Sequence, residues 1–356
     1  MNDLTESEKQ DLISEIHSAR EDVSNVSQIL LDLEAELGEI ESALATLPSI
    51  LESLRYRGYI FLRYLDRSID SLSSSWRDVS PPIREAVRSM KYSFQPNAES
   101  LQAEMDRVDS EIDRSSESVS SGYEQVVESL SSRAESLESH ARQDAEHVSG
   151  ALRNFKEALS SIQRDISIAE NTLQLTSQAS FRLREGENPL LALRAKYLLG
   201  EKNEGSLFLT DQRFSFEGER DVVLEKLWIL PTKKRKERFV VAEAPIGAIA
   251  EIAKGRVGLL EWTGVYVRFK PETGWAEMPF DVKGEEANTI VRFFNYLSGG
   301  DADLDKTDLQ GTAAQKRIST PTIVRCGYCG APYSREIYRG QISLKCEYCG
   351  SSIALG

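Results

Sequence analysis

The stretch LISEIHSAREDVSNVSQILLDLEAELGEIESALATLPSILESL, residues 12–54, decides the first half of the fold. Its apolar residues recur in steps that alternate between four and three: Leu12, Ile16, Ala19, Val23, Val26, Leu30, Leu33, Leu37, Ile40, Leu44, Leu47, Leu51 and Leu54. Six unbroken heptads of this kind are typical of the narrow a/d seam of a coiled coil. Pro48 predicts a bend, because proline removes one hydrogen bond from the helical ladder.

A second helical run is expected over about 98–178, with Leu101, Met105, Val108 and Ile112 on its seam. Each run would be on the order of 110–120 Å long at 1.5 Å per residue. Similar lengths favour an antiparallel hairpin within one chain, and a parallel homodimer remains the main alternative. Between the runs, Ser80 before Pro81 and Pro82 predicts the start of a short connecting helix over 76–97.

An aromatic belt lies just before that connection, at Tyr56, Tyr59, Ile60, Phe61, Leu62, Tyr64 and Leu65, with three arginines interleaved. One interpretation is a helix that lies in a membrane interface. The other is a packing site that needs apolar residues on more than one face. We favour packing, because a full ring of apolar residues is more often buried against other helices.

The whole chain has 356 residues and a formal net charge of −14. Residues 1–180 hold 33 acids against 17 bases, a net of −16, so the second half carries a net of +2. This balance argues against a dedicated nucleic-acid binder. The acidic start is not that of a signal peptide, and no apolar stretch reaches the roughly 18 residues of a spanning helix. We therefore expect neither an integral membrane protein nor a disulfide-stapled secreted one, but a cytoplasmic protein, peripheral to a membrane.

From about 186 the pattern changes to short alternating or apolar runs separated by turn signals. The candidate strands are Leu190–Leu198, Ser206–Thr210, Phe214–Glu217, Val222–Ile229, Phe239–Val241, Ile249–Ala253, Gly258–Trp262, Val265–Phe269 and Trp275–Phe280. An amphipathic helix follows over 284–298. Seven or more short strands closed by one helix predict a small β-sandwich or barrel plugged by that helix.

The segment GSLFLTDQRFSFE, residues 205–217, has a glycine, an apolar strand, Thr-Asp, a basic residue and a second apolar strand. It resembles the core of GRAM domains, which belong to the pleckstrin-homology-like superfold; APIGAI, residues 244–249, fits a later strand of that family. The resemblance covers about 186–300 and implies binding to anionic lipid or to protein partners. We expect Thr210 and Asp211 to form the turn between the two strands, with Asp211 bonding the local backbone.

Five bases in six residues follow, at Lys233, Lys234, Arg235, Lys236 and Arg238. We expect this basic run on a turn between strands, where it could bind lipid phosphates. The equal alternative is a solvated turn that keeps a hairpin soluble.

The last segment carries Cys326-Gly-Tyr-Cys329-Gly330 and Cys346-Glu-Tyr-Cys349-Gly350, a CxxC-x16-CxxC pattern. Four thiolates suit one tetrahedral Zn²⁺, and each following glycine permits a positive φ. The pattern resembles the zinc-ribbon family across about 322–354, with a hairpin of Tyr333–Ile337 and Gln341–Leu344 around Gly340. We expect one structural zinc, because four protein ligands leave no open position. A redox pair or disulfides are disfavoured by the doubled spacing.

Arg325, Arg335, Arg339 and Lys345, interleaved with Tyr328, Tyr333, Tyr338 and Tyr348, could form a basic aromatic surface for nucleic acid. We favour the simpler interpretation that the tyrosines build a tiny core and the bases keep it soluble.

The sequence thus predicts a multidomain α plus β chain: a coiled coil over 1–180, a GRAM/pleckstrin-homology-like domain over 186–300, a flexible linker over 301–321 and a zinc ribbon over 322–356. No P-loop, GxSxG or HExxH motif occurs, so we do not expect an enzyme or a small-molecule substrate. We expect an adaptor or scaffold that binds protein partners, itself included, through the coil and docks through the β domain on an anionic membrane. The alternatives are a nucleic-acid-associated protein that uses the ribbon, and a purely protein-binding scaffold.

Overall fold

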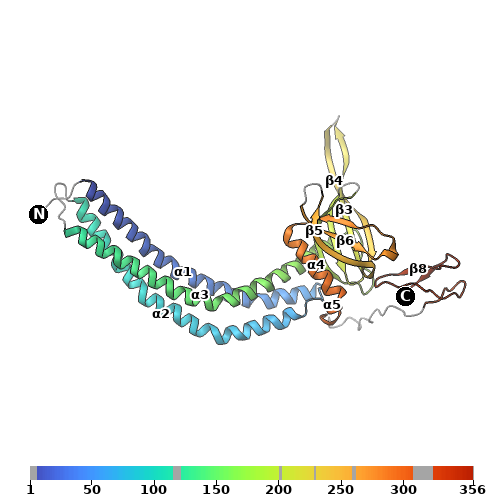
Figure 1. Ribbon diagram of the computed structural model, residues 1–356, viewed down its shortest axis with the longest axis horizontal. Coiled ribbons are helices and arrows are strands. Elements are labelled where there is room, and N and C mark those ends of the chain that lie inside the picture. Colours follow the sequence, from blue (N-terminus) through green and yellow to red (C-terminus); the bar gives the residue numbers. More distant parts are fainter. Residues whose placement is uncertain are drawn as a thin grey trace. The chain divides into compact units, whose positions relative to one another are not determined.

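The structure is a computed structural model that describes residues 6–114, 122–199, 203–227, 230–258, 262–307 and 324–355 (Figure 1). Over 221–227 and 230–236 it describes the backbone alone. The chain divides into two compact units. One comprises Met1–Pro48 with Arg67–Gln163, and the other comprises Ser49–Asp66 with Arg164–Gly356.

Three long helices occupy the described part of the first half: α1 (Glu6–Tyr56), α2 (Tyr64–Arg114) and α3 (Gly122–Ser177). All thirteen residues of the heptad pattern in α1 are buried, with Val26 fully so. The predicted seam of α1 is therefore confirmed as its buried face. None of the helices in the described ranges is both long and apolar enough to cross a membrane.

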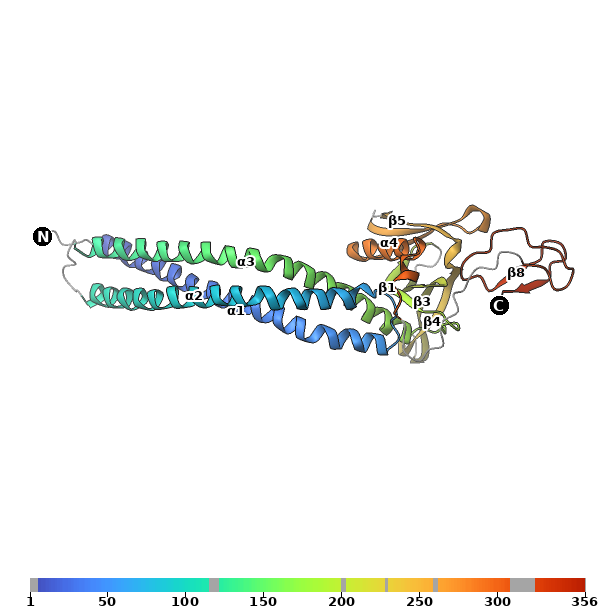
Figure 2. The same ribbon diagram turned by 90° about the horizontal axis from the view of Figure 1, so that it is seen from below.

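Within the helical unit the three helices run side by side (Figure 2). Ion pairs join them: Lys91 with Glu34 and Arg84 with Glu41 between α1 and α2, Arg133 with Glu104 between α2 and α3, and Lys156 with Glu36 between α1 and α3. Between α1 and α2, the residue number of one partner rises as that of the other falls, so these two helices are antiparallel. The α1–α3 pair has the opposite relation, so the chain runs up, down and up again.

The predicted short helix over 76–97 is wrong, because α2 continues through Pro81, Pro82 and Pro96. Its buried residues keep one seam across all three prolines: Trp76, Ser80, Ile83, Val87, Met90, Phe94, Ala98, Leu101, Met105, Val108 and Ile112. Each proline costs a backbone hydrogen bond, but the continuous buried seam offsets that loss.

The chain instead reverses over 57–63, where the sequence analysis expected helix. Gly58 has a φ of 93° and Leu62 a φ of 59°, a left-handed conformation that only glycine adopts without strain. The buried Arg55 holds this reversal together, since its guanidinium donates to the carbonyl oxygens of Tyr59, Phe61 and Leu62 at 2.8, 2.6 and 3.0 Å.

The second reversal falls between Arg114, where α2 ends, and Gly122, where α3 begins. The expected unbroken run over 98–178 is therefore wrong. Residues 115–121 between the two helices lie outside the described part.

Most of the aromatic belt is a packing site, although Tyr56 at its start is 93% exposed. Tyr59, Ile60, Phe61 and Leu62 are all buried and lie outside any helix, and the Tyr59 hydroxyl donates to the carbonyl oxygen of Leu190 at 3.0 Å. The interfacial membrane helix is therefore wrong for these residues.

The second unit contains a seven-stranded antiparallel sheet, with the order β4-β3-β2-β1-β7-β6-β5. Its strands are β1 (Pro189–Tyr197), β2 (Asn203–Thr210), β3 (Arg213–Leu227), β4 (Leu230–Pro245), β5 (Ile249–Val257), β6 (Trp262–Phe269) and β7 (Met278–Asp281). Among the described strands, the two meanders β1–β4 and β5–β7 are hydrogen-bonded to each other through the short β1–β7 pairing, and α4 (Gly284–Ser298) contacts β5, β6 and β1. The predicted change to strands closed by one helix is confirmed, but the individual strand bounds are only partly so. The candidate strand Gly258–Trp262 has a turn at Gly258 and otherwise falls mostly on residues 259–261, which lie outside the described part.

Aromatic rings fill the core of this β domain. Phe214 and Phe216 from β3 contact Phe280 from β7, with ring centroids 5.9 and 5.0 Å apart, and Phe293 of α4 is also buried. Gly205 lies where β2 and β3 come closest, since a Cβ there would be 1.9 Å from the carbonyl oxygen of Glu217. Gly205 is therefore required by packing.

Two predicted strands, Phe214–Glu217 and Val222–Ile229, are one strand, β3, whose described residues end at Leu227. No turn separates the two predicted strands at Gly218, because Gly218 pairs with Gly205 on one side and Phe239 on the other. Pairing between β3 and β4 continues as far as Leu227 opposite Leu230. Short elements complete the described chain: α5 (Asp301–Leu304), β8 (Ser343–Lys345) and β9 (Ser352–Ala354).

Candidate functional site

The two Cys-x-x-Cys turns have matching backbones. The amide of Cys326 donates to the carbonyl oxygen of Ala331, and the amide of Cys346 donates to that of Ser351, both at 2.8 Å. Gly330 and Gly350 follow with φ of 74° and 73°, so the expected positive φ after each turn is confirmed. Each pair is thereby presented in the same way to a common centre.

The four cysteine sulfurs lie within 4.8 Å of one another. Cys326 and Cys349 have their Sγ atoms 3.6 Å apart, and Cys329 and Cys346 have theirs 3.5 Å apart. Tetrahedral zinc with bonds of about 2.3 Å needs sulfurs roughly 3.8 Å apart, so the cluster fits the ion. The four thiols are free and suitable for one metal.

Ser351 favours the thiolate form that a metal needs. Its Oγ lies 3.2 Å from Sγ of Cys326 and 2.8 Å from Sγ of Cys349. This hydrogen bond, helped by the backbone N–H groups of Cys329 and Tyr328, lowers the pKa of Cys326 to about 6. The same hydroxyl lowers the pKa of Cys349. A deprotonated thiol is the ligand form for zinc.

The cysteine-containing segment, described over residues 324–355 and called the ribbon from here on, has very little core of its own. Its buried cluster consists of Cys326, Leu344, Cys346 and Ile353. The predicted hairpin of Tyr333–Ile337 with Gln341–Leu344 is wrong as a strand pair, because β8 pairs with β9 across the second cysteine turn. Gly340 does form a turn, with φ of 83°.

The basic run lies within β4, not on a turn. Lys233, Lys234, Arg235 and Lys236 are paired along the backbone with β3, opposite Glu225, Val223, Val222 and Asp221 respectively. Their side chains lie outside the described part. The side chain of Arg238 is engaged, since its Nε donates to Glu219 at 3.1 Å and its guanidinium also reaches the carbonyl oxygen of Gln178.

The four bases of the ribbon are not equivalent. Arg335 forms an ion pair with Glu347, and Arg339 forms one with Asp303 of α5. Arg325 and Lys345 are exposed. Two of the four candidate nucleic-acid contacts are thus occupied within the chain.

The tyrosines divide as well. Tyr333 packs against the ribbon core, and the Tyr338 ring lies 4.9 Å from the Lys270 ammonium. Tyr328 and Tyr348, at equivalent positions of the two cysteine turns, are 85% and 71% exposed. Only Tyr333 therefore fits the prediction that the tyrosines build a core.

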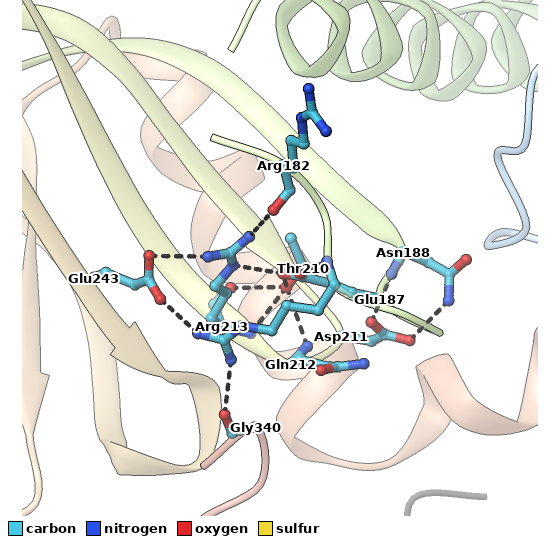
Figure 3. Close-up of polar contacts among 10 residues, drawn as sticks. Arg182, Glu187, Asn188, Thr210, Asp211, Gln212, Arg213, Glu243 and Gly340 are labelled. Atoms are coloured by element: carbon cyan, nitrogen blue, oxygen red, sulfur yellow. Dashed lines mark hydrogen bonds and ion pairs between the residues drawn. The ribbon is translucent and has the colours of Figure 1, made fainter. Parts of the chain in front are cut away.

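Thr210 and Asp211 hold the β2–β3 turn in a way that only partly matches the expectation (Figure 3). The Thr210 hydroxyl accepts the turn's amides, from Gln212 at 3.1 Å and Arg213 at 2.9 Å. The Asp211 carboxylate instead accepts the amide of Asn188 at 2.8 Å, which joins the turn to the start of β1.

A buried ion pair that the sequence did not predict lies beside this turn (Figure 3). Arg213 Nε lies 2.7 Å from a carboxylate oxygen of Glu187, and their side chains are 5% and 0% exposed. The same guanidinium also bonds Glu243 at 2.9 Å and the carbonyl oxygen of Arg182 at 2.7 Å. The only signal in the sequence was a charged residue directly after a turn, at the start of an apolar strand.

Comparison with known proteins adds little. No protein-family model matches the chain, and no curated protein matches it. Solved structures that match include the Vps36 N-terminal PH domain, with 16% identity, 33% of this chain and 86% of that chain covered, and a TM-score of 0.22. The DH/PH domains of p115-RhoGEF match with 14% identity, coverage of 83% and 95%, and a TM-score of 0.24. The C-terminal domain of an unknown protein from Leishmania infantum matches with 14% identity, coverage of 31% and 86%, and a TM-score of 0.21. TM-scores this low carry no argument about the function of this chain.

Proposed function

We propose that this protein is a non-enzymatic adaptor whose GRAM/pleckstrin-homology-like domain docks on an anionic membrane surface through the basic run. The coiled-coil region, over 1–180, would act as a spacer and protein-binding element. The domain boundaries at 186–300 and 322–356 belong to the same proposal. Of the predicted flexible linker over 301–321, the first part is instead ordered by α5 and by the ion pairs of Asp303 and Lys306, and residues 308–321 lie outside the described part.

One observation carries the membrane proposal. The last residue of β3 that pairs with β2 is Gly218, whereas pairing with β4 continues to Leu227. The nine residues 219–227 and their partners in β4 therefore project from the sheet as a two-stranded arm, which is visible at β4 in Figure 1. The basic run lies on this arm, where a flat surface can approach it.

The charge of the arm is enough for measurable binding. Residues 219–238 hold seven Lys or Arg against four Asp or Glu, a net of +3. At about 1 kcal/mol per base near an anionic surface, the net charge favours binding by about 3 kcal/mol, or roughly a hundredfold.

Vesicle co-sedimentation of the full, zinc-loaded chain tests the proposal. We expect pelleting with phosphatidylserine vesicles, reversal by salt, and no pelleting with phosphatidylcholine alone. Replacing Lys233, Lys234, Arg235 and Lys236 together with Ala should reduce pelleting to the phosphatidylcholine level.

The matched control keeps the charge and changes the side chains, with Arg in place of the three lysines and Lys in place of Arg235. It should bind as the natural chain does. Equal binding by the alanine variant would refute the membrane role and favour the purely protein-binding scaffold.

The four-cysteine ribbon is proposed to hold one structural zinc through Cys326, Cys329, Cys346 and Cys349. With four protein ligands the ion would hold the fold and leave no open position for chemistry. Nucleic-acid binding by the ribbon is the less favoured alternative, because Arg335 and Arg339 already form ion pairs within the chain.

A further inference from the structure

We propose that the β domain carries a recognition site for an Arg-Gly turn, and that its ligand is Arg339-Gly340 of the chain's own ribbon. The site consists of the β2–β3 turn, α5 and the short helical turn Ile246–Ala248. All of these residues belong to one compact unit.

The site binds the side chain of Arg339 through all three of its guanidinium nitrogens. Two nitrogens of the Arg339 guanidinium lie 2.7 and 2.9 Å from the two carboxylate oxygens of Asp303, which is the bidentate geometry. The third nitrogen, Nε, donates to the carbonyl oxygen of Asp211 at 2.7 Å. Lysine has no planar fork and could satisfy only part of this set.

The site also binds the backbone carbonyl oxygens of Arg339 and Gly340. The amide of Gly247 donates to the carbonyl oxygen of Arg339 at 3.1 Å. The guanidinium of Arg184 donates to the carbonyl oxygen of Gly340 at 3.0 Å, and this contact is drawn at Gly340 in Figure 3. Both carbonyls of the dipeptide therefore have a dedicated donor in the β domain.

Glycine is required on both sides of the contact. A Cβ on Gly340 would lie 1.5 Å from the carbonyl oxygen of Gln212, and its φ of 83° already disfavours other residues. A Cβ on Gly247 would lie 2.5 Å from the amide nitrogen of Arg339. The β domain thus has partners for the Arg339 side chain and for both carbonyl oxygens, and it leaves no room for a Cβ at Gly340. These four features together make the contact specific for an Arg-Gly dipeptide.

The Arg339-Gly340 turn can dock only when the ribbon is folded. This step of the inference rests on the proposed zinc site. The buried cluster of the ribbon is only four residues, two of them cysteines. Without metal the segment has too little core to hold the turn, so zinc removal should vacate the site.

Hydrogen exchange of the full chain tests the site, with the Gly247 amide as reporter because its acceptor belongs to the ribbon. Asp303→Asn removes the carboxylate from the β-domain side, and Asp301→Asn in the same short helix is the matched control. Arg339→Lys removes the fork from the ribbon side, and Arg325→Lys is its control. We expect exchange at Gly247 to accelerate about tenfold in Asp303→Asn and Arg339→Lys, and to be unchanged in the two controls.

The Gly350 amide reports on the folding of the ribbon itself, because it donates to the carbonyl oxygen of Cys346 at 2.9 Å within one cysteine turn. It should stay protected from exchange in all four variants. Unchanged exchange at Gly247 in both test variants would overturn the site. Chelation should expose Gly247 in the natural chain as well. If chelation exposes Gly350 but not Gly247, the dependence on zinc is overturned, whereas a chain that binds no zinc fails the metal proposal alone.

Discussion

The buried ion pair of Arg213 with Glu187 allows the sharpest test of the β domain. Replacing Glu187 with Ala leaves the Arg213 charge in a site that is 5% exposed, although Glu243 and a backbone carbonyl still contact it. Breaking a buried pair from one side costs about 3–5 kcal/mol. Because one partner remains, we expect about 3 kcal/mol, the lower end of that range.

Replacing Arg213 with Ala should cost more, about 4 kcal/mol, because it also removes the contact of the guanidinium with the Phe181 ring at 4.8 Å. The double replacement should cost much less than the sum of the two, since no unpaired charge is left behind.

Amide hydrogen exchange within Leu207–Leu209 of β2 measures this stability in the β domain alone. A loss of 3 kcal/mol accelerates exchange roughly 150-fold. The control is Arg194→Ala: the Arg194 side chain is 51% exposed, so its ion pair with Glu219 should contribute at most about 1 kcal/mol. A Glu187→Ala effect no larger than this control, or additive single effects, would refute the reasoning.

Three further outcomes are expected. Cys346→Ser should abolish stoichiometric zinc binding and amide protection in 324–355 without changing the far-UV circular dichroism of the helices; a fully zinc-loaded variant would contradict the site. The pKa of Tyr64 is raised above its ordinary value of 10.0 by burial and by its hydrogen bond to Asp165. The stability from this group is therefore full below pH 10 and is lost as pH rises from there toward the higher folded pKa, so Tyr64→Phe should show a smaller alkaline loss in urea titrations. Met105→Ala should destabilise the helical unit by about 2–5 kcal/mol in thermal melts, since Met105 is fully buried, and a change no larger than that of an exposed residue such as Glu99→Ala would contradict the seam.

Periodicity predicted which residues of the helices are buried but not where the helices end. Heptad spacing follows from the geometry of helix packing, so the seam of α1 could be derived residue by residue. The prolines of α2 were misread as boundaries because the packing that tolerates them comes from other helices. The true reversal at 57–63 depends on Arg55, whose acceptor carbonyls cannot be recognised in a sequence.

The β domain shows the same division. Alternation and turn residues located most strands, and the glycine at 205 marked a close approach. The long β3–β4 arm was missed because Gly218, Pro231 and the charged run are all local turn signals. Cross-strand pairing over 219–238 overrides those signals.

The cysteine cluster was predictable because the spacing of two Cys-x-x-Cys pairs directly indicates a set of four metal ligands. The Arg-Gly site was not, since Arg339 and Asp303 are 36 residues apart and follow no shared period. Arg339 was instead grouped with other bases as a nucleic-acid contact.

Because the arm of β3 and β4 projects from the sheet, the charge met by a surface at the arm differs from the net charge of the whole protein. Nine residues of extended chain span roughly 30 Å, so the lysines of the arm stand some 10–25 Å from the sheet. Ionic screening at physiological salt has a range of about 8 Å. Under the proposed membrane role, an anionic surface at the arm would meet the local net charge of +3 of residues 219–238, more than one screening length from the sheet, although the whole molecule carries −14.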